Sequence, residues 1–439
     1  MKLMSKESII AAIDLGSEKC TTLIARVTEH NTLRVLGFSV VASRGMKRSA
    51  IIDLDQVLNT ISQGLDAAER MAGLSIKSAV VSVGGVQIKY KNSKGVVAVA
   101  SANQEIMDSD VERVIEAARA VSMPSEREII HVIPKDFKVD SQEGIKDPVG
   151  MTGVRLEAEA HIVTGMSTAL RNLEKCVADM GVKVDQFVFS ALAAAEVSLT
   201  ETEKELGVVL VDIGAGTTSI TAYTDGTLTY SGVLPVGARH LTLDLALGCR
   251  IAMDDAEKLK LYLTEHGLDD LRPHPGESKT DFTKRRRKLD ELDPEKIGIA
   301  HSDRLSKKTL IGGIMEPRIK EIFRLVMQEL DKAELLVGNQ IPAGLVLTGG
   351  GALTASLLEV AKKVTNLPVR VARPEEIEGL TDDIKRPNFA VAVGLLAVAK
   401  KQGSVAEVGS DFDWKGLIPG DLFKNLSSKL GGLFKSLLP

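Results

Sequence analysis

The chain has little cysteine, few aromatic residues and no long apolar segment, and each shortage excludes a class of protein. Three of its 439 residues are cysteine, in no paired or metal-like spacing, which excludes a disulfide scaffold and indicates a reducing compartment. Aromatic residues make up 3% of the chain and the net charge is −4, so no nucleic-acid-binding surface is expected. The longest apolar run, 389–399, is about half the length of a bilayer span. No segment is therefore expected to cross a membrane.

The chain is long and apolar enough to fold into more than one lobe. Its length exceeds that of an ordinary single domain, and its 44% hydrophobic and 26% charged residues are typical of a globular protein. The apolar run 9–13 is followed by no cleavage-site pattern, so it is interpreted as a first strand and not as a signal peptide.

A pattern of strand, Asp-x-Gly turn and strand occurs twice, about two hundred residues apart. The strand-like run 9–13 leads into a turn at 14–17 and a second β-rich run. The run 207–211 leads in the same way into 212–218, and another β-rich run follows. A duplicated unit of this kind predicts two similar lobes that face each other across a cleft.

Between the two copies the sequence predicts a small inserted α+β module. Its strand candidates alternate with a helix that has one apolar face, and a further helix follows it. The strand candidates are 80–83, 96–100, 129–133 and 154–163, and the two helices carry Val111, Val114, Ile115, Ala118 and Val121, and Leu170, Leu173, Cys176, Val177 and Met180.

The Asp-x-Gly turns have the chemistry of a phosphate and magnesium site. Glycine lets backbone N–H groups approach phosphate oxygens, and an aspartate at a strand end can hold Mg²⁺ through water. One such turn is common in plain hairpins, whereas two that each follow a strand favour a shared site. Asp14 and Asp212 are the predicted metal-organising residues. The residues expected to contact phosphate are Gly16, Ser17, Lys19, Gly214, Ala215, Gly216, Thr217 and Thr218.

A third glycine-rich turn is expected in the same cleft. The strand-like run 345–348 ends in Gly349, Gly350, Gly351 and Ala352, where the backbone could approach a flat ligand such as adenosine. The alternative is a tight connection between a strand and a helix.

In order and spacing these three motifs resemble the superfamily of actin, Hsp70 and sugar kinases, and within it the FtsA family of bacterial cell-division proteins. The resemblance covers nearly the whole chain. It implies an α/β, actin-like ATPase fold, with two ribonuclease-H-like lobes around a nucleotide cleft, an inserted α+β subdomain and a C-terminal amphipathic helix. The further motifs that carry it are Ser43-Arg44-Gly45-Met46-Lys47, Pro235-Val236-Gly237-Ala238, Glu316-Pro317-Arg318 and Arg386-Pro387-Asn388-Phe389-Ala390.

The resemblance also implies a division of the chain. The first lobe is expected at 1–83, 166–204 and 381–401, the inserted subdomain at 84–165, the second lobe at 205–245 and 311–380, an outer subdomain with a charged insertion at 246–310, a linker at 402–420 and the amphipathic helix at 421–439.

By the same resemblance the cofactors are ATP and Mg²⁺. Glu257 and Lys260 are expected at the ribose and base, and Arg318 over the adenine; the alternative for all three is ordinary helix-surface charge. Asp212 could also position a water for attack on the γ-phosphate. No separate base has motif support, so ATPase activity is expected to be slow at most.

The segment 267–306 departs from the family pattern, because it is longer and more basic. Its run 284–288 is flanked by acidic residues and is interpreted as a solvated insertion or helix face; the alternative is a patch that binds nucleic acid or lipid.

The last residues predict a helix that lies in a membrane interface. On a helical wheel the apolar side chains of 421–438 fall in an arc of about 160°, with three lysines opposite. The alternative is a terminal helix docked on the protein itself, against which the Gly- and Ser-containing linker and Gly431-Gly432 argue. The membrane-facing residues are Leu422, Phe423, Leu426, Leu430, Leu433, Phe434, Leu437 and Leu438.

The family resemblance implies a cell-division role on the cytoplasmic face of the membrane, at the septum. There the protein would polymerise, tether FtsZ filaments through the FtsZ C-terminal tail, and help recruit other division proteins; nucleic acid is not an expected partner. The FtsZ tail is expected on the subdomain 246–310. Two alternatives share the fold: a PilM-type pilus-assembly protein and a sugar or acetate-type kinase. Neither would ordinarily carry a lipid-binding tail.

Overall fold

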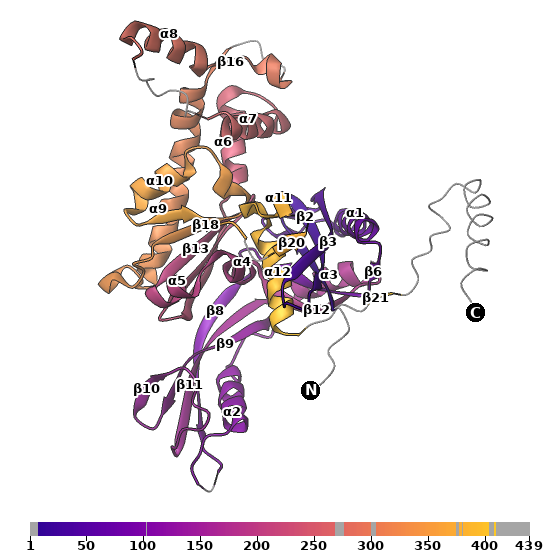
Figure 1. Ribbon diagram of the computed structural model, residues 1–439, viewed down its shortest axis with the longest axis vertical. Helices are drawn as coiled ribbons and strands as arrows, with labels where there is room; N and C mark the ends of the chain where they lie inside the picture. The colour runs from indigo at the N-terminus through magenta and orange to yellow at the C-terminus, as the bar shows by residue number, and fades with distance from the viewer. Residues whose placement is uncertain are drawn as a thin grey trace, which may run out of the picture.

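The computed structural model describes residues 8–101, 103–267, 276–299, 304–374, 377–379, 381–403 and 408–409. The predicted tail helix lies outside these residues, as does most of the predicted linker. The described chain forms two lobes side by side and an inserted subdomain that projects from their lower end in Figure 1.

The first lobe is built on a six-stranded sheet in the order β12-β7-β1-β2-β3-β20. Side chains of β1 alternate between two cores: Ile9 and Ile13 pack with α1 and α3, while Ile10 packs on the other face with α12. Both faces of this central strand are buried, which explains why its sequence is a continuous apolar run. The lobe contains β1 (Ile9–Leu15), β2 (Lys19–Val27), β3 (Leu33–Ala42), β4 (Met46–Lys47), β5 (Ala50–Ile51), α1 (Leu54–Ala72), β6 (Ser75–Ile76), β7 (Ser78–Val83), α3 (Ser167–Ala178), β12 (Lys183–Phe189), α4 (Ser190–Ser198), β20 (Ile377–Gly379), α11 (Thr381–Ile384), α12 (Ala390–Lys401) and β21 (Val408–Gly409).

The second lobe repeats this plan on a five-stranded sheet in the order β15-β14-β13-β18-β19. Its central strand β13 also divides its side chains between two cores. Val209 and Val211 face the core that contains α6 and α9, and Leu210 faces a smaller core shared with α4. The lobe contains α5 (Glu201–Leu206), β13 (Val208–Ile213), β14 (Thr218–Thr224), β15 (Thr227–Leu234), α6 (Ala238–Cys249), α7 (Met253–Glu265), a π-helix (Thr309–Met315), α9 (Glu316–Lys332), β18 (Leu345–Thr348), α10 (Leu357–Thr365) and β19 (Val369–Val371).

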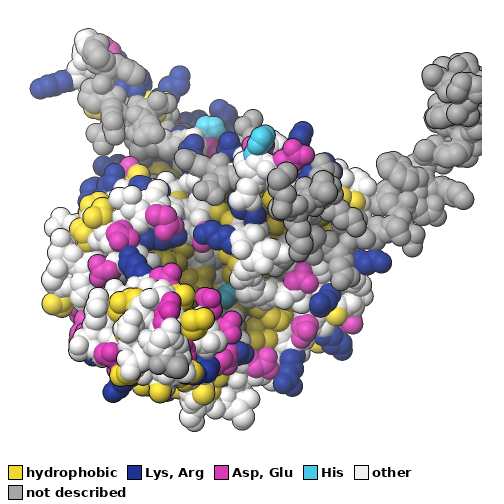
Figure 2. All heavy atoms as spheres, turned by 60° about the horizontal axis from the view of Figure 1, so that its bottom comes forward, with side chains coloured by type: hydrophobic (Ala, Val, Ile, Leu, Met, Phe, Trp, Pro, Cys, Tyr) yellow, Lys and Arg dark blue, Asp and Glu magenta, His cyan; other side chains and the backbone are white. Residues whose placement is uncertain are grey.

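The inserted subdomain is a four-stranded sheet in the order β10-β9-β11-β8, covered by α2. The strand candidate 80–83 is not part of it, because β7 pairs with β1 and β12 in the first lobe. Figure 2 brings the free end of the subdomain forward and shows acidic side chains beside hydrophobic ones there. Its elements are β8 (Lys89–Ala98), α2 (Asp108–Arg119), β9 (Arg127–Val139), β10 (Gln142–Ile145) and β11 (Arg155–Met166).

A buried junction joins the inserted subdomain to the second lobe. Nε2 of His161 on β11 lies 2.9 Å from Oγ of Ser231 on β15, and the His161 ring stacks on Tyr90 with 4.8 Å between centroids. Tyr90 in turn meets the ring of Tyr230 edge to face. The inserted subdomain therefore contacts the lobe that carries the second Asp-x-Gly turn, besides the lobe into which it is inserted.

The charged insertion forms a separate outer part above α6 and α7 in Figure 1. The basic run lies in α8 (Lys279–Asp290), which is followed by β16 (Glu291–Leu292) and β17 (Leu305–Ser306). Arg285 donates to Glu277 at 2.7 Å. Within the described residues, no helix is both long enough and apolar enough to span a bilayer.

Candidate nucleotide cleft

The two Asp-x-Gly turns have the same local geometry. In the first, the Gly16 N–H donates to the Lys19 carbonyl at 3.0 Å and closes the turn between β1 and β2. In the second, the Gly214 N–H donates to the Thr217 carbonyl at 2.9 Å between β13 and β14. The duplication in the sequence is thus a duplication of backbone structure.

Both turns line one large cleft between the lobes. The cleft has a volume of about 1190 Å³, which is ample for a nucleotide. Among the predicted site residues, the ones that line it are Asp14, Gly16, Ser17, Lys19, Asp212, Gly214, Ala215, Gly216, Thr217, Glu257, Lys260, Gly349, Gly350 and Gly351.

Asp14 and Asp212 enter the cleft from opposite lobes. Asp14 Oδ1 accepts a hydrogen bond of 2.7 Å from the Ser82 hydroxyl, and burial raises the pKa of Asp14. Burial, reinforced by the Asp14 carboxylate, raises the pKa of Asp212 to about 7. A cation bound between the two carboxylates would favour the ionised form of both.

Lys19 lies close to this acidic pair. Its Nζ donates to the backbone carbonyl of Asn388 at 2.7 Å and sits 4.3 Å from the centroid of Phe389. Burial lowers the pKa of Lys19, while Asp14 and Asp212 oppose that shift. Lys19 thus places an amino group beside the Asp-x-Gly turns and connects the first turn to the segment that returns to the first lobe.

The residues present fit a nucleotide with a magnesium ion. Carboxylate oxygens are suitable Mg²⁺ ligands, directly or through water, and the paired turns offer backbone N–H groups to phosphate. Oδ1 of Asn388, which also lines the cleft, is buried without a hydrogen-bond partner among the described residues. It is therefore available to accept a hydrogen bond from a ligand. No group of three or more potential metal-ligating side chains occurs in the described chain, so ligand oxygens would complete the coordination.

The three glycines of the third turn serve two different purposes. A Cβ on Gly349 would lie 2.3 Å from Asp212 Oδ1, and one on Gly351 would lie 2.4 Å from Ile213 Cγ2. These two glycines let the turn pack against the end of β13. At Gly350 an added Cβ would only make an ordinary contact, 3.8 Å from the Asn388 Cβ, so close packing does not require glycine at this position of the cleft lining.

Substitution of Gly349 is expected to be strongly destabilising. Gly349 has φ of 82°, so Gly349→Ala combines backbone strain with a collision, at a cost of about 3 kcal/mol or more. The matched control is Gly181→Ala, because Gly181 has φ of 77° but nothing within 4 Å of an added Cβ. The control should lose only about 1–2 kcal/mol in urea unfolding. Equal losses in the two variants would show that the close approach to Asp212 does not matter.

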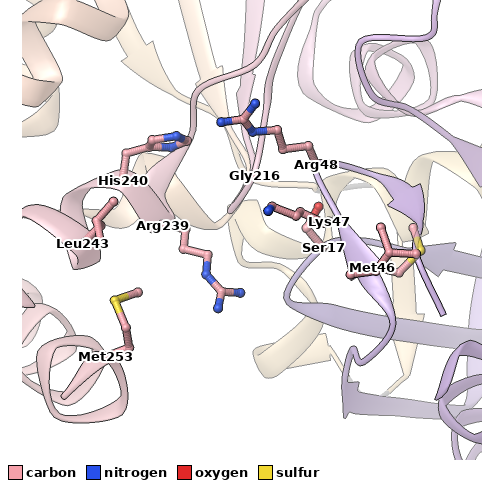
Figure 3. A pocket seen from close by; sticks show the side chains of 10 residues that line it. Ser17, Met46, Lys47, Arg48, Gly216, Arg239, His240, Leu243 and Met253 are labelled. Carbon is pink, nitrogen blue, oxygen red and sulfur yellow. The ribbon is translucent and has the colours of Figure 1, made fainter.

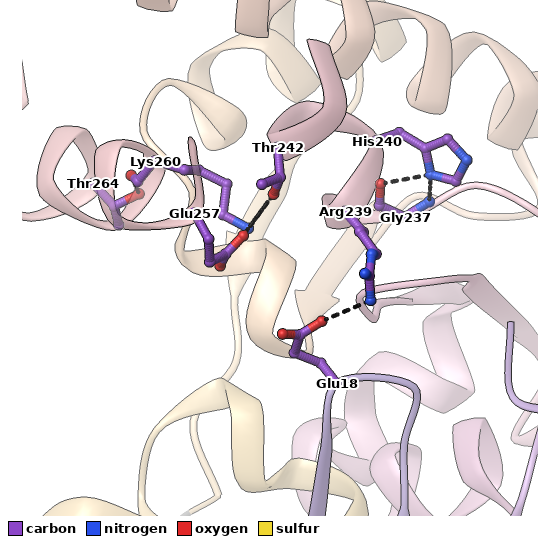
Figure 4. A network of polar contacts seen from close by, with 8 residues as sticks. All are labelled: Glu18, Gly237, Arg239, His240, Thr242, Glu257, Lys260 and Thr264. Carbon is purple, nitrogen blue, oxygen red and sulfur yellow. Dashed lines mark hydrogen bonds and ion pairs between the residues drawn. The ribbon is translucent and has the colours of Figure 1, made fainter. Parts of the chain in front are cut away.

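Glu257 and Lys260 reach the cleft from α7 as parts of one polar network (Figure 4). Lys260 Nζ donates to Glu257 Oε2 at 2.7 Å and to Thr242 Oγ1 at 3.1 Å, and the Thr242 hydroxyl donates to the same carboxylate at 2.6 Å. The network ties α7 to α6 and fixes both charged groups at the cleft wall.

Three predicted residues are not among those that line the cleft. Arg318 donates to both carboxylate oxygens of Asp244, at 2.8 and 3.0 Å, and joins α9 to α6. Thr218 is buried and donates to the Val236 carbonyl at 2.8 Å. Ala352 is buried too.

Several residues that line the cleft were not singled out in the sequence. Ser49 donates its N–H to Ser17 Oγ at 2.8 Å, and nothing in the sequence pattern indicated this contact. Leu261 and Leu353 are half exposed and line the cleft with Lys260 and Gly350; an exposed leucine has no sequence signal of its own. Arg386 also lines the cleft and lay within a quoted motif.

Two lobes of the same plan, each with an Asp-x-Gly turn on a shared cleft, define the actin-like class of nucleotide-binding proteins. The solved PilM-PilN type IV pilus biogenesis complex matches with a TM-score of 0.60 and 14% identity, over 91% of this chain and 99% of that chain. MreB5 of Spiroplasma citri bound to ADP matches with a TM-score of 0.50 and 14% identity, over 90% and 97%. These matches show the fold alone.

Sequence comparisons are more specific. Residues 85–164 match the model of the SHS2 domain inserted in FTSA, and residues 209–394 match that of cell division protein FtsA. The cell division protein FtsA of Borreliella burgdorferi is 36% identical over 97% of this chain and 98% of that relative. FtsA of Pseudomonas aeruginosa is 36% identical and that of Escherichia coli K12 is 34% identical, each over 90% of both chains. The chain therefore belongs to the FtsA family of cell division proteins. Its likeness to a pilus-assembly protein is limited to the fold.

Proposed function

We propose that this cell division protein binds ATP with Mg²⁺ between its lobes, polymerises, and tethers FtsZ filaments to the cytoplasmic face of the membrane at the septum. Family membership supports the division role. The observation that carries the nucleotide part is the pair of matching turns that bring Asp14 and Asp212 to one cleft from opposite lobes.

In this proposal different residues of the cleft contact different parts of the nucleotide. Asp14 and Asp212 hold the Mg²⁺ ion, which neutralises phosphate charge when it is bound. The two turns and Lys19 hold the phosphates, and Glu257 with Lys260 faces the ribose and base. Asp212 would also orient the attacking water, and turnover is expected to be slow at most because no separate base has motif support.

The membrane part of the proposal rests on the sequence of 421–438. Eight large apolar side chains on one helical face, with three lysines opposite, favour reversible binding to anionic lipid. A polymer would align many such tails on one surface and raise the effective affinity without new contacts. The FtsZ tail is proposed to bind within 246–310, and other division proteins are recruited to the same assembly.

Liposome co-sedimentation with and without Mg-ATP tests the proposal, with electron microscopy of the pellet. We expect more protein in the pellet with Mg-ATP, and filaments on the liposome surface. A phosphate release rate in the kinase range, roughly 1–100 per second, stimulated by a sugar or short-chain acid, would instead support a kinase.

A further inference from the structure

A second, smaller cavity lies beside the nucleotide cleft, between the two lobes (Figure 3). Its volume is about 460 Å³. One wall is the β4–β5 hairpin with Ile52 from the first lobe, and the other wall is α6 with the start of α7 from the second. Ser17 and Gly216 line both this cavity and the nucleotide cleft. We call this cavity the inter-lobe groove.

The groove has an apolar surface that is open to solvent. Ile52 is 67% exposed and Leu243 is 42% exposed, and Met46 and Met253 line the groove beside them. Apolar side chains from two lobes that gather around one concavity are a sign of a binding surface, whereas scattered exposed apolar residues are not.

The groove also has three cationic side chains. Lys47, Arg48 and Arg239 line it together with His240, and in the described part of the chain neither Lys47 nor Arg48 has a carboxylate within salt-bridge distance. Arg239 pairs with Glu18 at 3.5 Å, but both side chains are more than half exposed, so this ion pair holds Arg239 only weakly.

We propose that the inter-lobe groove binds a short acidic peptide of a partner protein, anchored by one large apolar side chain. The cationic side chains match an acidic sequence, and the volume matches an anchoring side chain and its neighbours better than a folded domain. A free inorganic anion would leave the apolar wall uncovered. A lipid bilayer cannot enter a concave site between two lobes.

The geometry couples this groove to the nucleotide. Arg48 and Ser49 sit at the tip of the hairpin with φ of 50° and 59°, a strained conformation for two successive non-glycine residues. Ser49 donates to Ser17, and a Cβ on Gly216 would lie 3.0 Å from the Arg48 Cα. The hairpin therefore touches both phosphate turns. The groove and the cleft are both bounded by the two lobes, so a peptide in the groove and a nucleotide in the cleft would each favour a particular distance between the lobes. Each ligand would then change the affinity of the other by the same factor.

Fluorescence anisotropy with the full chain and no nucleotide tests the site. The probe is a short labelled peptide of Asp and Glu residues around one Phe. Lys47→Glu and Ile52→Ser should each weaken binding at least about tenfold, the scale of a hot-spot truncation. Neither residue lines the nucleotide cleft, so Mg-ATP binding serves as a readout that both variants are folded.

Matched controls distinguish binding in the groove from effects of any change in surface charge or surface hydrophobicity. Lys77→Glu changes an exposed lysine between β6 and β7, and Val337→Ser changes a side chain that is 64% exposed elsewhere; both should leave the peptide affinity unchanged. A peptide with Ser in place of Phe, or with Lys in place of the acidic residues, should bind at least about tenfold more weakly.

Three outcomes would overturn the proposal. The first is peptide binding that is absent or insensitive to Lys47→Glu and Ile52→Ser. The second is equal binding of the Ser-substituted peptide, which would indicate a polyanion site. The third is self-association of the peptide-free chain, measured by sedimentation, that is lost in Lys47→Glu. This result would assign the groove to a second copy of the chain.

The coupling between peptide and nucleotide rests on the proposed nucleotide binding and is measured separately, by repeating the peptide titration with Mg-ATP. If Mg-ATP does not change the peptide affinity, the coupling is wrong, but the peptide site measured without nucleotide is unaffected.

Discussion

Asp212→Asn is expected to lower Mg-ATP affinity by about 100-fold or more in calorimetry, because even outer-shell partners of a metal contribute up to about that factor. Asn keeps the size of the side chain and removes the charge that would face the ion. The control is Asp185→Asn, which changes an exposed aspartate on β12 outside the cleft. Wild-type affinity in the Asp212 variant would show that the cleft is assigned wrongly.

The same variant is expected to be more stable than the wild type when no nucleotide is bound, at pH 8. The folded-state pKa of Asp212 is about 7, against 3.8 for the exposed group. The folded state therefore binds more protons than the unfolded state between these values, and its stability falls as pH rises through them. Asn does not titrate, so its advantage should shrink as the pH is lowered to 5. Thermal unfolding at the two pH values measures this, and an advantage that grows on acidification would contradict the burial of this carboxyl.

Phe434→Glu, or removal of 421–439, is expected to abolish liposome binding while Mg-ATP binding survives. The substitution puts a charge within the apolar face, where the helix would have to carry it into the acyl boundary. Ser428→Glu is the matched control, because it adds the same charge on the opposite face of the predicted helix. It should keep most of the binding to neutral liposomes and lose only part of it to anionic ones.

Co-sedimentation of the three proteins with both kinds of liposome distinguishes the outcomes. A truncated chain that still pellets would place the lipid site elsewhere, with the basic run on α8 as the next region to test. Loss of Mg-ATP binding together with liposome binding would instead mean that the change in the tail disturbs the folded lobes.

The sequence predicted the fold where a local pattern repeats. The strand predicted at 9–13 is β1, Ile9–Leu15, and the one at 207–211 is β13, Val208–Ile213. Both predictions succeeded because a strand buried on two faces is a continuous apolar run, and because each run is followed by a recognisable Asp-x-Gly turn. The strand candidate 80–83 was recognised for the same reason. Its assignment to the inserted module was wrong, because neither the spacing of apolar residues nor the amino-acid composition indicates which sheet a strand joins.

Contacts between distant segments could not be predicted from local pattern. Lys19 was named as a phosphate residue, yet its contact with Asn388 spans 369 positions. Arg318 is held by Asp244 across 74 positions, and no spacing rule links an aspartate on α6 with an arginine on α9. The inter-lobe groove was missed too, since its walls come from segments almost two hundred residues apart.

The order of the strands has a consequence for how the protein is made. The second lobe uses a continuous stretch of chain from α5 to β19, whereas the first lobe is completed only when β20 pairs with β3 and α12 packs against β1. During synthesis, domains fold as units once their residues are available. The second lobe can therefore fold before α12 has been synthesised, when β1 and Asp14 still lack one of the helices that pack against their sheet. The segment proposed to bind lipid, 421–439, is translated after α12, so a ribosome-bound chain could complete both halves of the cleft before this segment is available to a membrane.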